Sequence, residues 1–169
     1  SHLAYQLSQK GDSKQALPLL EKALSLGRDD AWLYAQLGYD YSEVNEYDKA
    51  AEYYEKAVAW FSRAVSADHK YAQYSLGGLY YRGQGVTQNY SQAFNLYQRS
   101  AEQGNPYASY EMAKMYRDGI GVAVNVENAE SCFEQAFSGF CRLEAQSHDD
   151  KLQYRLGQML HTGTGTVKD

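Results

Sequence analysis

The sequence predicts an all-α solenoid, in which successive helical repeats stack on one another, and three observations lead to this class. Residues 47–68, YDKAAEYYEKAVAWFSRAVSAD, have the pattern of one helix about 30 Å long. Small and large residues of this helix recur 34 residues upstream and 36 residues downstream. The chain also has only 2 prolines, and good helix formers fill the segments between its glycines.

The two recurrences share a residue of the long helix, which predicts a change of repeat type there. Ala50, Tyr54 and Ala57 match Ala16, Leu20 and Ala23, whereas Ala57, Phe61 and Ala64 match Ala93, Tyr97 and Ser100. Small residues let neighbouring helices approach, and large residues fill the space between them. We therefore expect one type of repeat over 1–68, with 47–68 as its junction helix, and a second type over 69–169.

Composition narrows the classes of function. The chain has 169 residues, of which 44% are hydrophobic, so a buried core is expected. Its formal net charge of -5 disfavours nucleic acid as a partner. No apolar run approaches the roughly 20 residues that a membrane span needs. No signal peptide pattern is visible, but the sequence begins in mid-repeat, so cytoplasm and periplasm both stay open.

Capping and helix-breaking residues divide the first half of the chain into four predicted helices. Acidic side chains such as Asp29 and Asp30 suit the N-terminus of a helix, and glycines such as Gly11 suit its C-terminus. Pro18 falls within the second helix, where it removes a hydrogen bond. The predicted helices are 3–10, 13–26 begun by Asp12 or Ser13, 31–44 and 47–68.

The first repeat type has a recognisable spacing over 34 residues. An aromatic residue, Leu-Gly, a tyrosine, an alanine, an aromatic residue and an alanine occupy Tyr34, Leu37, Gly38, Tyr41, Ala50, Tyr54 and Ala57. This pattern resembles the tetratricopeptide repeat, a pair of antiparallel helices. The match is partial in the preceding unit, and Ser62 stands where the family often has a proline.

The second repeat type begins with YAQYSLGGLYYRGQGVTQNYSQAFNLYQRSAEQG, at 71–104. Its marker positions are Ala72, Leu76, Gly77, Tyr80, Gly83, Gly85, Val86, Ala93, Tyr97, Ala101 and Gly104. A copy 36 residues later has Ala108, Met112, Ala113, Tyr116, Gly119, Gly121, Val122, Ala129 and Phe133. The pattern resembles the Sel1-like repeat, which implies a right-handed α-solenoid of antiparallel helix pairs.

A third copy lies at an offset of 44, and the sequence stops inside it. Its positions are Tyr154, Leu156, Gly157, Gly163 and Gly165, and the extra residues fall in FSGFCRLEAQSHDD, as an insertion or a lengthened helix. Asn89 and Asn125 are predicted to cap second helices, and the equivalent position is Asp169, the last residue. We therefore expect further repeats in the natural protein, and an unpaired last helix that frays or mediates self-association.

No motif predicts catalysis, a metal or a cofactor. The RGQGV, DGIGV and TGTGT segments follow helices and recur in register, whereas phosphate-binding glycine loops follow a strand, so we expect them to link helices through positive-φ glycines. The histidines, His2, His69, His148 and His161, lack the spacing of metal ligands. His148 with the two aspartates after it is predicted to be a helix cap. Cys132 and Cys141 are expected to be small buried residues, with a single bridge between them left open.

The family resemblance implies that the first helix of each pair lines a concave wall. The candidate partner-binding residues on it are Trp32, Tyr39, Tyr71, Tyr74, Tyr81, Arg82, Tyr107, Tyr110, Lys114, Arg117, Tyr154 and His161. Ala35, Ser42, Lys151 and Gln158 share this wall. The wall is thus aromatic with a basic tilt, although Tyr74, Tyr110 and Tyr154 recur so regularly that a role in the core also stays open. The second helices instead carry Glu102, Glu127, Glu130 and Glu134.

These features predict a protein–protein interaction scaffold or adaptor, a class that is often bacterial. It would hold a peptide or partner domain in its groove by stacking on tyrosines, with Arg82, Lys114 and Arg117 pairing to acidic groups. One alternative is an inhibitor of the immunity type that blocks a toxin enzyme, which predicts a single nanomolar partner. Another is self-association through the C-terminal end, which predicts concentration-dependent oligomers.

Overall fold

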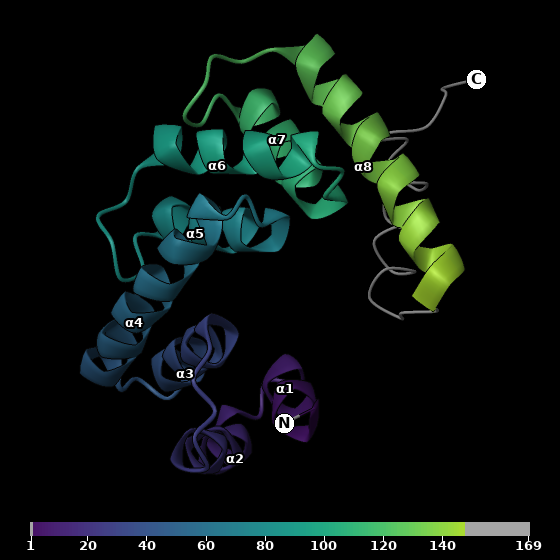
Figure 1. Cartoon of the computed structure of the whole chain (residues 1–169). Coiled ribbons are helices and arrows are strands. Elements are labelled where there is room, and N and C mark those ends of the chain that lie inside the picture. The colour runs from purple at the N-terminus through teal and green to yellow at the C-terminus, as the bar shows by residue number, and fades with distance from the viewer. Residues whose placement is uncertain (1, 148–169) are drawn as a thin grey trace.

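The structure, a computed structural model, describes residues 2–147, and this part of the chain is entirely helical apart from its turns. Its helices are α1 (His2–Gln9), α2 (Ser13–Ser25), α3 (Ala31–Glu43), α4 (Tyr47–Ser66), α5 (Lys70–Arg82), α6 (Tyr90–Glu102), α7 (Pro106–Asp118) and α8 (Val126–Ser147). Helices that are adjacent in the sequence pack on one another throughout. Figure 1 shows α1–α3 at one end, α4 leading away from them, and α5–α7 at the other end with α8 beside α7. The predicted α-solenoid is confirmed.

The capping residues predicted from the sequence begin the helices as expected. The Asp12 side chain accepts a hydrogen bond from the Gln15 amide, which settles the open choice between Asp12 and Ser13. Asn89 and Asn125 cap α6 and α8 in the same way. The long helix ends at Ser66, two residues before its predicted end, because Asp68 adopts a left-handed conformation with φ of 61°.

Both repeat registers of α4 face the core. Ala50, Tyr54, Ala57 and Phe61 are all buried, so the small and large positions pack together as predicted. The core forms two clusters, one from α1 to α6 and one from α6 to α8, and Tyr80 packs against both. The hydrophobic core is therefore continuous along the solenoid rather than gathered in one place.

The two Gly-x-Gly loops within the described residues pack their Sel1-like units against the preceding pair of helices. Gly83 and Gly119 end α5 and α7 in the left-handed conformation, which confirms the positive-φ role predicted for these glycines. The second glycine of the first loop, Gly85, lies so close to α4 that a Cβ would be 2.5 Å from the Tyr54 carbonyl carbon. The loop after α7 makes the same kind of approach at Gly121, to the backbone of Tyr90. The third copy of this loop lies outside the described residues.

A buried carboxylate, which was not predicted from the sequence, joins the first three helices. Asp40 in α3 is fully buried and accepts hydrogen bonds from Ser8 Oγ at 2.5 Å and Ser13 Oγ at 2.6 Å. Gln36 Nε2 donates a third, longer bond of 3.2 Å. No basic side chain in residues 2–147 forms an ion pair with Asp40. Neutral hydroxyl donors therefore take the place of water around this charge.

The extra residues before the third Sel1-like copy lengthen a helix, since α8 has 22 residues against 13 in α6. Cys132 and Cys141 both lie on α8 as free thiols. Nine residues of helix separate them by about 13.5 Å along the axis, which is too far for a disulfide. Cys132 is buried as expected, but the expectation was wrong for Cys141, which is exposed because its position faces away from α7 and the core.

This arrangement predicts unequal reactivity of the two thiols. We expect a maleimide to label Cys141 rapidly in the native protein and Cys132 only after unfolding. Burial raises the pKa of Cys132, so less of this thiol is the reactive thiolate at neutral pH. Mass spectrometry of labelled peptides would measure both rates. Equal labelling of the two cysteines in the native protein would contradict the helix packing described here.

Candidate partner-binding site

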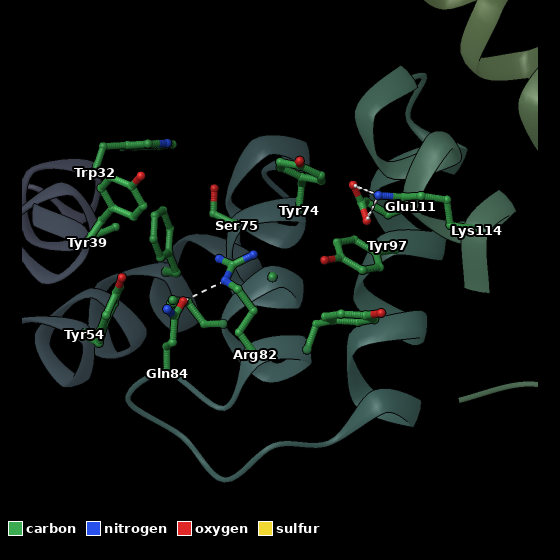
Figure 2. A pocket seen from close by; sticks show the side chains of 15 residues that line it. Trp32, Tyr39, Tyr54, Tyr74, Ser75, Arg82, Gln84, Tyr97, Glu111 and Lys114 are labelled. Carbon is green, nitrogen blue, oxygen red and sulfur yellow. Dashed lines mark hydrogen bonds and ion pairs between the residues drawn. The ribbon is translucent and has the colours of Figure 1, made fainter. Parts of the chain in front are cut away.

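A pocket of about 560 Å³ lies where the first helices of three successive pairs come together (Figure 2). Its walls come from α3, α5 and α7, and buried rings of α4 and α6 close it from behind. The lining side chains are Trp32, Ala35, Tyr39, Tyr54, Phe61, Tyr74, Ser75, Leu79, Tyr81, Arg82, Gln84, Tyr97, Glu111 and Lys114, with Gly78 contributing backbone. The three helices that form the walls are those that the sequence predicted for the concave face.

The α3 side of the pocket is aromatic and accessible. Trp32 is 47% exposed and Tyr39 is 42% exposed, so a ligand can reach both rings. The Trp32 ring packs edge-on against the buried Phe61, with ring centroids 5.3 Å apart. The His69 ring also contacts the indole, with ring centroids 5.8 Å apart. Phe61 and His69 thus hold Trp32 in place while nearly half of this residue stays exposed.

Arg82 lies in the middle of the pocket, between the α3 side and the α7 side (Figure 2). Its Nε donates a hydrogen bond of 2.7 Å to Gln84 Oε1. Its Nη1 and Nη2 atoms have no hydrogen-bond or ion-pair partner within residues 2–147. The guanidinium group is therefore oriented on one edge and free on the other.

Gly78, which has no side chain, leaves the space that the Arg82 guanidinium occupies. Gly78 lies 39 residues after Tyr39 and 36 before Lys114, the same offsets that relate Leu76 to Leu37 and to Met112. The flanking repeats thus carry a large side chain at the position where the middle repeat has glycine. A Cβ on Gly78 would be 3.0 Å from Arg82 Nη2, so the guanidinium occupies the space that the absent side chain leaves.

The positive charge of Arg82 affects the pKa of two buried tyrosines, Tyr54 and Tyr97. Burial raises the pKa of Tyr54 in α4 to about 12, and the positive charge of Arg82 partly offsets this rise. Burial also raises the pKa of Tyr97 in α6, with Glu111 adding to the rise and Arg82 opposing it. Both phenols therefore stay neutral at physiological pH, and neither neutralises the arginine.

The other predicted cations are paired. Lys114 Nζ lies 3.0 Å from Glu111 Oε2, and its charge also lies 5.0 Å from the centre of the Tyr110 ring. Arg117 makes two hydrogen bonds to the neighbouring Asp118, which lower the pKa of that carboxyl group. Among the wall residues within 2–147, the predicted cations therefore reduce to one that is unpaired at the pocket, Arg82.

The structure gathers half of the candidate residues at the pocket and leaves the others elsewhere. Those at the pocket are Trp32, Tyr39, Tyr74, Tyr81, Arg82 and Lys114. Those outside it, but within the described residues, are Tyr71, Tyr107, Tyr110 and Arg117. Tyr154 and His161 lie outside the described residues, as do the wall positions 151 and 158 and the cap predicted at His148.

Tyrosines that recur in register have mixed roles. Tyr74 lines the pocket and also contacts the buried Tyr97, with ring centroids 5.7 Å apart. Tyr110 instead packs edge-on against Phe133, at 5.6 Å, within the second core cluster. Tyr71 is 39% exposed at the start of α5, beside His69, whose Nδ1 accepts from the Ala72 amide and caps that helix. The repeat register alone thus does not separate core tyrosines from accessible ones.

The pocket residues Ser75, Gly78, Gln84 and Glu111 were not predicted from the sequence, and neither was the role of the buried rings in its rear wall. A signal existed for three of these four residues, Ser75, Gly78 and Glu111. The offsets that connect Tyr39 with Lys114 lead directly to Gly78, and the offset of 36 connects Ser75 with Glu111. No sequence pattern indicated Gln84, because it acts through its contact with Arg82.

The repeat-family matches and one of the two solved structures below agree with the architecture. Residues 70–105, 106–139 and 151–169 match the Sel1 repeat, and residues 33–65 match the tetratricopeptide repeat. The crystal structure of a Sel1 repeat protein from Oxalobacter formigenes superposes on 99% of this chain with a TM-score of 0.55 and 23% sequence identity. A protective antigen of uropathogenic Escherichia coli strains, described as an SLR fold, covers 90% with a TM-score of 0.49 and 21% identity. No curated protein sequence matches the chain.

The chain spans 63% of the Oxalobacter protein and 45% of the Escherichia coli protein. Sel1 and tetratricopeptide repeats generally act as protein–protein interaction modules, and proteins built from them are typically scaffolds without catalytic activity. None of the helices in 2–147 is long and apolar enough to span a membrane. The Sel1 matches together cover more than half of the sequence, so this chain belongs to the Sel1 repeat family, with a tetratricopeptide repeat ahead of its Sel1 repeats.

Proposed function

We propose that this chain is an adaptor that holds a segment of a partner protein in the pocket between α3, α5 and α7. The observation that carries the proposal is the meeting of accessible aromatic rings and an unpaired arginine in one concave site of about 560 Å³. Tyrosine, tryptophan and arginine are the residues most often responsible for binding energy at protein interfaces. Three successive repeats contribute to the site, so a bound segment would lie across them.

The surroundings of the pocket suit a peptide better than a small molecule. The rings of Trp32 and Tyr39 offer broad contact area, and tyrosine loses little conformational entropy on binding. A second hollow, lined by residues of α1–α3, also has Trp32 in its lining, so a longer chain could contact it beyond the first site. Tyr71, Tyr107, Tyr110 and Arg117 stay predicted contacts for the flanking parts of such a chain.

A comparison of two single-charge variants tests this function. We expect partners recovered from source-cell lysate by the wild-type protein to be lost with Arg82→Glu and retained with Arg142→Glu. Both substitutions make the same chemical change at an exposed arginine, but Arg142 lies on α8 outside the pocket. Circular dichroism would confirm that both variants are folded. Equal recovery by the two variants would contradict a role of the pocket in partner binding.

A further inference from the structure

The charge balance of the pocket indicates what kind of segment it accepts. The ionisable groups that line it, apart from tyrosines, are Arg82, Glu111 and Lys114. Glu111 and Lys114 pair with each other at 3.0 Å, which leaves one net positive charge on Arg82. This local excess contrasts with the net charge of -5 on the whole chain. The carboxylates of Asp40 and Glu43 add to the rise that burial causes in the pKa of Tyr39 and Tyr54, so negative charge lies near the α3 side of the pocket. The positive excess is therefore confined to Arg82, where it attracts one negative group.

The geometry of Arg82 matches a carboxylate. Its Nε is fixed to Gln84, and the edge formed by Nη1 and Nη2 is free to donate two parallel hydrogen bonds. The guanidinium lies in the space above Gly78, between the neutral phenols of Tyr54 and Tyr97. A single guanidinium balances the single charge of a carboxylate, whereas phosphate groups carry more charge and are usually met by clusters of arginines.

The position of Arg82 in the pocket indicates where this carboxylate belongs in the ligand. The pocket continues on one side of Arg82 at the rings of Trp32 and Tyr39 (Figure 2). On the other side it continues at the rings of Tyr74 and Tyr97 and at the Glu111–Lys114 pair. A chain that ended at Arg82 would leave one of these sides empty. An Asp or Glu side chain within an extended segment would let the backbone occupy both sides.

We propose that the pocket recognises an internal Asp or Glu of a partner segment through Arg82, with a bulky apolar side chain of the same segment placed against Trp32 and Tyr39. This inference rests on the proposed function and specifies its ligand. Gly78 is a positioning residue in this scheme, because it leaves the space that holds the guanidinium in the middle repeat. Lys114 and Arg117 have their own carboxylate partners and are not anchors.

A displayed library of random peptides, joined through their carboxyl ends so that none is free, would test the inference. Peptides enriched on the wild-type protein should share an Asp or Glu near a bulky apolar residue. Such a peptide, made with a blocked carboxyl end, should bind at least about tenfold more weakly after its Glu is changed to Gln. The Arg82→Gln protein should bind the original Glu peptide with a similarly reduced affinity. The Arg82→Gln protein and the Gln peptide together should lose no more affinity than either change alone.

Gly78→Ala provides a second variant, which keeps the Arg82 charge but displaces the guanidinium group. Alanine favours the helix, and the atoms it meets are the end of a flexible side chain, so this variant should fold at least as well as wild type. We expect this variant to bind the Glu peptide several-fold more weakly than wild type does, and to bind the Gln peptide with unchanged affinity. Equal effects on the two peptides would overturn the positioning role.

The outcomes separate the inference from the function beneath it. The enriched peptides could require Tyr39 for binding, lack a carboxylate, and bind the Arg82→Gln protein as tightly as wild type. This result would overturn the inference but would leave the proposed function in place. Binding that requires a free terminal carboxylate, found with a second library of open carboxyl ends, would overturn the assignment to a side chain. The absence of enriched peptides, or peptides indifferent to Tyr39→Ala, would overturn both.

Discussion

Gly85→Ala is expected to destabilise the protein by about 3 kcal/mol or more. Gly85 has a φ of 73°, which a residue with a side chain rarely adopts, and its added Cβ would lie 2.5 Å from the carbonyl carbon of Tyr54. The loop after α5 cannot then stay seated on α4 without moving the backbone. Urea unfolding followed by circular dichroism would measure the loss of stability, and separation of the α3–α4 pair from the α5–α6 pair is the expected first step.

Gly104→Ala is the matched control for this change. Gly104 has a similar φ of 86°, but nothing lies within 4 Å of the Cβ position. The control should therefore cost only the backbone term, about 1–2 kcal/mol. Equal destabilisation of the two variants would mean that the close approach of the loop to α4 contributes nothing to stability. The packing of this loop against α4 would then be described incorrectly.

Removing both hydroxyl groups that surround Asp40 is expected to have the other large effect. In the Ser8→Ala/Ser13→Ala variant the buried carboxylate loses donors at 2.5 Å and 2.6 Å and keeps only the longer bond from Gln36. Hydrogen bonds to a charged group contribute about 1.5–3 kcal/mol each, so the pair should cost about 3–6 kcal/mol. We expect α1 and α2 to detach before the rest of the solenoid unfolds.

Hydrogen exchange resolved along the chain would show this local opening. Protection should fall in α1 and α2 and stay near its wild-type level in α5–α7. Ser25→Ala, on the exposed face at the end of α2, provides a control of the same chemical type. A double variant as stable as this control would mean that the Asp40 hydrogen bonds do not hold the first helices in place.

Most of the fold could be predicted because the same helix-packing pattern recurs in successive repeats of the sequence. The spacing of Ala57 and Phe61 in two registers, and of paired glycines after two helices, is a local signal that follows directly from helix packing. Asp40 could not be predicted, since its partners lie 27 and 32 residues away and have no fixed spacing from it. The exposure of Cys141 also depends on the orientation of α8, which the sequence pattern does not specify.

The candidate site was predictable in outline but not in its charges. The family resemblance placed Tyr39, Tyr81 and Arg82 on the wall, and all three line the pocket. It gave equal weight to Arg82, Lys114 and Arg117, but only contacts between side chains distinguish a paired cation from a free one. The empty position at Gly78 is visible in the repeat offsets, yet its consequence appears only once Arg82 is seen to fill it.

Photo-cross-linking from within the pocket tests the central claim most directly. A photoreactive phenylalanine analogue would replace Tyr39, inside the pocket, or Tyr47, which is 63% exposed on α4 outside it. The account predicts that position 39 cross-links to one defined segment of a partner protein in source cells, that the segment carries an Asp or Glu, and that position 47 does not reach it. Cross-links to the same segment from position 47 but not from position 39 would contradict the account.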